Sequence, residues 1–206
     1  MSQTQPEQPR PRGRPRGFDE AAALEAALRV FWACGYDQAS VAQLCRAAGM
    51  PRASLYQIYG GKEGLFLAAL DRYAATRLAL VAAALGPRGS LAEDLRAFFE
   101  AVVTLAAGGA DPPGCLISGV LADAAMTHPG LRAERDRRLG VLETLLERRF
   151  AIAGDPADPA IRAALAAAAA RGLVLRARTG WDAARLRPVA AAAPASFAAC
   201  PVPADA

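Results

Sequence analysis

The sequence predicts an all-α fold, with a small N-terminal helix-turn-helix unit followed by a larger helical C-terminal unit. Three observations support this prediction. Apolar residues recur with the spacing of one helix face, and the alternation of apolar and polar residues that marks a strand is missing. Ala, Leu and Arg, which are among the best helix formers, dominate the composition.

The first three predicted helices follow one another closely. Asp19 is a good N-cap for a helix that Gly35 ends. Ser40 can cap a short second helix, which Gly49 stops, and Pro51 suits the first turn of a third helix, "PRASLYQIYG". The gap between the second and third helices is only a few residues, which is typical of a helix-turn-helix.

Longer helices are predicted beyond this unit, separated by loops rich in Gly, Pro and Asp. Ser90 and Glu93 form a capping box at the start of one of them. We expect helices at about 62–85, 90–107, 114–126, 129–152, 158–179 and 182–198. The predicted organisation is an arm (1–17), a helix-turn-helix domain (18–66), a larger helical domain (67–200) and a tail (201–206).

The N-terminal arm contains "RPRGRPRGF", residues 10 to 18, with four arginines on alternate positions. The chain has a formal net charge of +4, and these four arginines alone carry four positive charges. The rest of the chain is therefore close to neutral, and the basic character is concentrated in the arm. Clustered arginine of this kind is the usual footprint of phosphate binding. The segment from Arg12 to Pro15 resembles the core of an AT-hook, which predicts that Arg12 and Arg14 lie in a DNA minor groove. The alternative is a solvated tail.

The third helix would enter the major groove as the second helix of the helix-turn-helix. It offers Arg52, Ser54, Tyr56 and Gln57, which can reach phosphates and base edges. Lys62 begins the next helix, where free backbone N–H groups also attract a phosphate. We expect Tyr and Ser to position the helix, and Arg and Gln to read bases.

From Gly17 to about Leu70 the sequence resembles the N-terminal domain of the tetracycline-repressor (TetR) family of bacterial transcription regulators. The resemblance rests on "S-V-x-x-L-x-x-A-A-G", "S-L-Y" and "K-E-x-L-F". By position, it implies DNA contacts at Ser40, Arg52, Ala53, Ser54, Tyr56, Gln57 and Lys62. Ile58 and Tyr59 stand where many members carry His-Phe, so the half-site sequence cannot be inferred.

The resemblance also implies a homodimer that binds a double-stranded palindromic operator, with its last two long helices pairing in a four-helix bundle. "IRAALAAAAARGLVLRAR" supports this independently, because its Ala stripe allows close helix approach. Leu165, Leu173 and Leu175 are the larger side chains expected at the interface. The alternative is an internal helix of a monomer.

The C-terminal domain is expected to sense a small apolar or electrophilic molecule. A helix starting near Pro113 would put Cys115 in its first turn, where it could act as a sensor thiol; a packed thiol is the alternative. Aromatic and apolar residues at helical spacing are the other candidates for a cavity wall, although such residues are more often plain core. With Cys115, the candidates are Phe66, Leu70, Tyr73, Phe98, Phe99, Val102, Leu116, Met126 and Leu142.

An enzyme is the competing class of function, and little in the sequence supports it. The one histidine, His128, precedes Pro129, where a helix N-cap is its expected role. No residue cluster has metal-ligand spacing, so neither a metal nor a cofactor is expected. No stretch is long and apolar enough to span a bilayer, and a cytoplasmic location is predicted. A repressor is the expected function, and an architectural or activating DNA-binding protein is the alternative.

Overall fold

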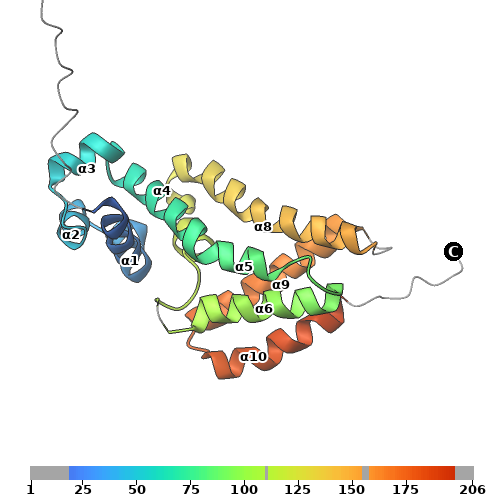
Figure 1. Ribbon diagram of the computed structural model, residues 1–206. Helices are drawn as coiled ribbons and strands as arrows, with labels where there is room; N and C mark the ends of the chain where they lie inside the picture. The colour runs from blue at the N-terminus through green and yellow to red at the C-terminus, as the bar shows by residue number, and fades with distance from the viewer. Residues whose placement is uncertain (1–18, 110, 155–157, 198–206) are drawn as a thin grey trace, which may run out of the picture.

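The computed structural model describes residues 19–109, 111–154 and 158–197, and all regular structure within these ranges is helical (Figure 1). In chain order the elements are α1 (Glu20–Gln38), α2 (Val41–Ala47), α3 (Arg52–Tyr59), α4 (Lys62–Tyr73), the π-helical segment η1 (Ala74–Leu78), α5 (Ala79–Ala84), α6 (Leu91–Ala107), the π-helical segment η2 (Ile117–Leu121), α7 (Ala122–Thr127), the 3-10 turn η3 (Pro129–Leu131), α8 (Arg132–Ala153), α9 (Pro159–Arg178), α10 (Ala183–Ala192) and the 3-10 turn η4 (Ala193–Ser196).

The predicted side-chain caps at Asp19, Ser40 and Ser90 are confirmed. The Asp19 side chain accepts a hydrogen bond from the backbone N–H of Ala21 at 2.9 Å. Ser40 Oγ accepts from Gln43 N at 3.2 Å, and the reciprocal capping box joins Ser90 to Glu93 at the start of α6. These side chains satisfy backbone donors that the first turn of a helix leaves without partners. Helices α1, α2 and α6 therefore begin close to the residues that the sequence indicates.

Aromatic side chains join the helix-turn-helix unit to α4. The Phe31 and Phe66 ring centroids lie 4.8 Å apart, and Trp32 meets Tyr73 edge to face at 5.1 Å. Phe31, Phe66 and Tyr73 are fully buried. Because α1 supplies one member of each pair and α4 the other, α4 packs as a structural part of the N-terminal unit.

The segment from α4 through η1 to α5 runs without a break from the helix-turn-helix unit along the rest of the molecule (Figure 1). This agrees with the single helix predicted over 62–85, but the middle turns are π-helical. Insertions of this kind are rare and are frequently found at functional sites. Helices α6 to α10, with the short segments η2, η3 and η4, form the remainder, and Phe99, Phe150 and Phe197 pack together in its core.

Three predicted helices differ from those in the structure. The first, which Gly35 is expected to end, continues to Gln38, with a kink at Gly35, whose φ is 81°. The helix expected over 114–126 begins only at Ile117, because Pro112, Pro113 and Gly114, with a φ of 107°, form an irregular segment first. A Cβ at Gly114 would lie 2.4 Å from Cγ of Arg178, so this segment also needs a glycine to pass α9. The helix expected over 182–198 ends at Ala192 and continues only as the turn η4, which contains Pro194.

Candidate nucleic-acid interface and ligand cavity

Helix α3 presents a short polar face to solvent. Pro51 precedes its first residue, and Gly60, with a φ of 73°, ends it two turns later. Leu55 is fully buried and fixes the inner face of the helix. The exposed residues on the opposite face are Arg52, Ala53, Tyr56 and Gln57. These side chains are free to meet a ligand outside the domain, as a DNA-reading helix requires.

Tyr56 occupies the middle of this face and is 46% exposed. The guanidinium of Arg52 lies over its ring, 5.7 Å from the centroid, so both side chains project from the same face of the helix. Gly61 follows Gly60, the residue that ends α3, and has a φ of 144° that L side chains rarely adopt. The Gly60-Gly61 pair thus allows the sharp passage from α3 into α4 that leaves Tyr56 accessible.

Two of the other predicted DNA contacts, Ser40 and Lys62, already have roles within the domain. Ser40 is exposed and caps α2, while Ser54 is half-buried. Lys62 Nζ donates to the Asp37 carbonyl oxygen at 3.2 Å and lies 4.6 Å from the centroid of the Tyr36 ring. A phosphate contact by Lys62 stays a prediction, and it requires the ammonium to exchange this carbonyl for a phosphate oxygen. Arg12 and Arg14 lie outside the described residues.

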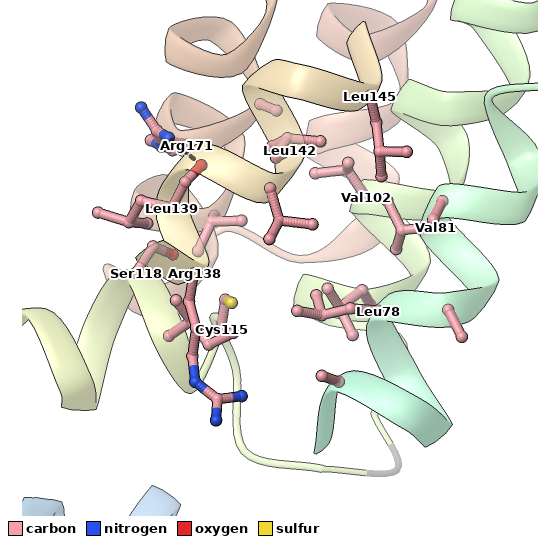
Figure 2. Close-up of a pocket in the computed structure, with 18 of the residues that line it drawn as sticks. Leu78, Val81, Val102, Cys115, Ser118, Arg138, Leu139, Leu142, Leu145 and Arg171 are labelled. Carbon is pink, nitrogen blue, oxygen red and sulfur yellow. Dashed lines mark hydrogen bonds between the residues drawn. The ribbon is translucent and has the colours of Figure 1, made fainter. Parts of the chain in front are cut away.

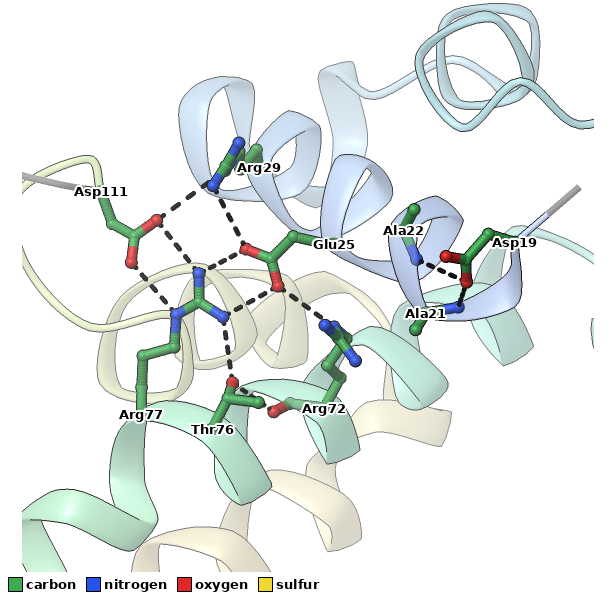
Figure 3. A network of polar contacts seen from close by, with 9 residues as sticks. All are labelled: Asp19, Ala21, Ala22, Glu25, Arg29, Arg72, Thr76, Arg77 and Asp111. Atoms are coloured by element: carbon green, nitrogen blue, oxygen red, sulfur yellow. Dashed lines mark hydrogen bonds and ion pairs between the residues drawn. The ribbon is translucent and has the colours of Figure 1, made fainter.

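A network of charges joins α1 to the segment that follows α4 (Figure 3). Arg77 of η1 donates from Nη1 to Glu25 Oε2 at 2.9 Å and from Nε to Asp111 Oδ2 at 3.1 Å. Arg72 of α4 donates to the same Glu25 oxygen at 3.1 Å. The hydrogen bond from Arg77 is the main cause that lowers the pKa of Glu25, against the opposing effect of burial. Glu25 is therefore held as a carboxylate between two arginines.

His128 makes a second contact between the two parts of the chain. Its Nε2 lies 2.6 Å from Oδ1 of Asp37, and its ring meets Tyr36 edge to face at 4.9 Å. His128 occupies the expected N-cap position, before the 3-10 turn η3, but its side chain makes no capping hydrogen bond to that turn. The ring points instead toward α1, and it joins the loop after α7 to the N-terminal unit.

A cavity of about 350 Å³ lies between the helices of the C-terminal part (Figure 2). Of the residues predicted to line it, Val102, Cys115 and Leu142 do so. Figure 2 shows Cys115, Arg138 and Arg171 on one side of this space and Leu78, Val81 and Val102 on the other. The walls are mostly aliphatic, as expected for a small-molecule site.

The other predicted wall residues do not line this cavity. The helices turn the large aromatic side chains inward, where they fill the core, and Met126 lies 71% exposed on α7. The fully buried candidates outside the cavity wall are Phe66, Leu70, Tyr73, Phe98, Phe99 and Leu116.

Cys115 reaches the cavity from a different backbone setting than expected. It lies two residues before η2 and not in the first turn of a helix, because Gly114 delays the helix start. Its side chain is buried beside Tyr73. Burial, followed by the proximity of Cys115, raises the pKa of Tyr73 well above its ordinary value. The Tyr73 hydroxyl has no hydrogen-bond partner among the described residues.

Sequence reasoning missed the charged residues of the cavity wall. They are Asp71, Arg137, Arg138 and Arg171. One signal was available for Arg138, because it falls at helical spacing with Leu142 and Leu145 and so belongs to the apolar face of its helix. Within the described ranges no group of three or more His, Cys, Asp or Glu side chains is arranged to hold a metal ion. Nor is any helix in those ranges long and apolar enough to cross a membrane.

Residues 23–69 match the model of the bacterial regulatory proteins of the tetR family. Over 62 residues, the chain is 50% identical to the HTH-type transcriptional repressor ComR of Escherichia coli strain K12. This alignment covers 30% of each chain, so the match spans less than a third of ComR. The family-model match, residues 23–69, contains α2 and α3 and thus the part of the chain that carries the exposed α3 face.

Solved structures extend the likeness to most of the chain. A cysteine mutant of the TetR family transcriptional regulator CifR, complexed with a 26-base-pair double-strand operator DNA, superposes with a TM-score of 0.82 at 28% identity. The superposition covers 89% of this chain and 100% of that one. SCO4454 of Streptomyces coelicolor shares the fold, with a TM-score of 0.68 at 22% identity over 85% of this chain and 92% of its own. Residues 23–69 thus form a helix-turn-helix domain of the TetR-family type, and the all-helical fold of the whole chain is similar to that of these TetR-family regulators.

Proposed function

We propose that this protein is a transcriptional repressor that binds a palindromic DNA operator as a homodimer and is released by a small molecule. The observation that carries the proposal is the exposed face of α3, where Arg52, Tyr56 and Gln57 share one side of a short helix. Such a helix fits the major groove, where side chains of these types bind phosphates and base edges. ComR is a repressor, and CifR is complexed with operator DNA, which supports the same role here.

The proposed dimer interface is the outer face of α9. Leu165 and Leu175 are 56% and 58% exposed, and Ile161 on the same helix is 61% exposed. Ala168 and Gly172 are exposed between them, so the face is flat enough for close helix packing. Leu173 is only 4% exposed and packs within its own chain, so it does not belong to the proposed interface.

In the proposed dimer, two recognition helices held about 34–36 Å apart would fit successive major grooves of the operator.

Release by a ligand follows from the position of the cavity. Its wall includes residues of α4 and η1, the segment that follows α3 and packs against α1. A ligand that shifts this segment would change the separation of the two recognition helices. A hundredfold loss of operator affinity needs about 2.7 kcal/mol of coupling, which is within the range that ligands supply. This mode of action requires that the protein share the cytoplasm with the chromosome.

The test is selection of bound DNA from a random library with purified full-length protein, followed by a mobility-shift titration of the recovered sequence. We expect a palindromic site that binds one dimer. A repressor should lower transcription from a promoter carrying that site. Recovery of DNA with no sequence in common would favour the architectural alternative, and increased transcription would favour an activator.

A further inference from the structure

The polar part of the cavity wall is centred on Arg138. Its side chain is 6% exposed and projects from α8 beside Cys115 (Figure 2). A guanidinium that is this deeply buried needs an anionic partner at all times, because an uncompensated buried charge is strongly destabilising. The identity of that partner therefore decides what the cavity can accept.

Two carboxylates are bound to Arg138, and they differ in how firmly they are held. Glu134 accepts from Nε and also receives two hydrogen bonds of 2.8 Å from Arg137. Asp71 of α4 accepts from Nη2 at 2.6 Å, but its side chain is 71% exposed. An exposed carboxylate can return to water at little cost. Asp71 is thus the exchangeable partner of Arg138.

A second cationic group on the same wall has a donor without an acceptor. Arg171 of α9 donates from Nη2 to Glu143 at 2.7 Å and to the Leu139 carbonyl at 3.1 Å. Its Nε is buried and has no hydrogen-bond partner among the described residues. Such an unmet donor is uncommon in a native protein and raises the local preference for an oxygen acceptor. The wall as a whole therefore favours an anion over a cation.

We infer that the cavity binds a small molecule with an apolar body and one carboxylate, and that this carboxylate replaces Asp71 on Arg138. The inference rests on the proposed function, since it names the chemistry of the releasing ligand. The exchange substitutes one carboxylate for another, so Arg138 is neutralised throughout. A volume of about 350 Å³ holds roughly twelve water-sized groups, the size of a medium-chain or aryl-substituted acid.

The exchange also gives the ligand a route to the DNA-binding unit. Asp71 lies on α4, whose first residue, Lys62, follows α3 after a two-glycine turn. While Asp71 holds Arg138, α4 is tied to α8 by a direct ion pair. A bound carboxylate breaks that tie, and α4 becomes free to move with the recognition helix. Occupancy by the acid should therefore lower operator affinity.

The experiment measures calorimetric binding of octanoate, decanoate and 4-phenylbutyrate to the DNA-free full-length protein, each beside the alcohol of the same carbon skeleton. We expect at least one acid to bind about tenfold or more tightly than its alcohol, which corresponds to about 1.4 kcal/mol. Arg138→Met should remove this preference. Arg148→Met, a matched change at an exposed position of the same helix outside the cavity, should retain it.

Asp71→Asn provides a second variant that keeps Arg138 in place and removes its competing carboxylate. It should bind the preferred acid several-fold more tightly and leave alcohol binding unchanged. Equal binding of every acid and its alcohol, or unchanged acid binding in Asp71→Asn, would overturn the inference. Operator binding is titrated separately. A protein that binds operator without any preference for acids contradicts only the inference, and one that binds acids without operator contradicts only the proposed function.

Discussion

Arg77 of η1 holds Glu25 of α1 through hydrogen bonds from both of its terminal nitrogens. The same guanidinium also binds Asp111, which lies four residues before Cys115 in the loop that leads to the cavity wall. One side chain therefore contacts the helix-turn-helix unit, the α4–α5 segment and the loop beside the cavity (Figure 3). This junction is where the packing of the C-terminal part can influence the orientation of α1.

Replacing Arg77 by Met should lower the free energy of unfolding by about 2–3 kcal/mol, because Glu25 and Asp111 would lose their shared partner while partly buried. Arg29→Met is the matched control, since Arg29 belongs to the same network but its side chain is 62% exposed. That change should cost less than about 0.5 kcal/mol. Urea unfolding at one fixed protein concentration measures both. Equal losses would show that the Arg77 network adds nothing beyond a surface ion pair.

Acid should weaken this junction through Glu25. Its pKa in the folded protein lies below the ordinary value of 4.5, chiefly because Arg77 donates to it. The stability that it contributes is therefore fully present above about pH 4.5 and is lost as the pH falls through the lower folded-state value. The difference in unfolding free energy between the wild type and Glu25→Gln should shrink steadily below pH 4.5. Glu147→Gln, a change at an exposed position of α8, is the matched control for the substitution itself.

Two neighbouring substitutions on α3 should separate phosphate contact from base contact. Tyr56→Phe removes one hydroxyl and should weaken binding to all DNA sequences by a similar factor. Gln57→Ala should change the preference among operator variants, with about 1–3 kcal/mol of discrimination lost at one base pair. Competition titrations against a set of single-base operator variants provide the measurement. If Tyr56→Phe altered the preference and Gln57→Ala did not, the assumed register of α3 in the groove would be wrong.

The arm should contribute to affinity and to its salt dependence. Deleting residues 1–16 removes four arginines and should lower operator affinity by roughly tenfold or more at low salt. The slope of log affinity against log salt should fall by about two to four units if each arginine neutralises about one phosphate. Thermal unfolding and the mass in solution should not change. An unaltered affinity and slope would show that the arm is only a solvated tail.

The dimer prediction rests on the apolar face of α9. Leu165→Glu combined with Leu175→Glu places two charges on each copy of the proposed interface and should yield a monomer at micromolar concentration. Leu80→Glu is the control, because Leu80 is 70% exposed on α5, away from this face. Light scattering measures the mass of each variant. A wild-type protein that is itself monomeric at this concentration would contradict the proposed dimer.

The sequence by itself determined the helical class, the helix-turn-helix and its caps. These features depend on interactions within a few residues, such as the hydrogen bond from Gln43 N to Ser40 or the positive φ at Gly60. The inner and outer faces of α3 could also be predicted, because Leu55 is apolar and its neighbours Tyr56 and Gln57 are polar or amphipathic. Local chemistry was sufficient wherever the deciding partners were neighbours in the chain.

The cavity and the junction between the two units were decided by tertiary structure alone. Arg138 meets Asp71 across 67 residues, and Arg77 meets Glu25 across 52. No local pattern indicates that these charges will be brought together, because the pairing depends on how α4, α8 and α1 pack. The same packing turns Phe98 and Phe99 into the core and leaves smaller side chains such as Val102 at the cavity, since large rings fill the space that a ligand would need.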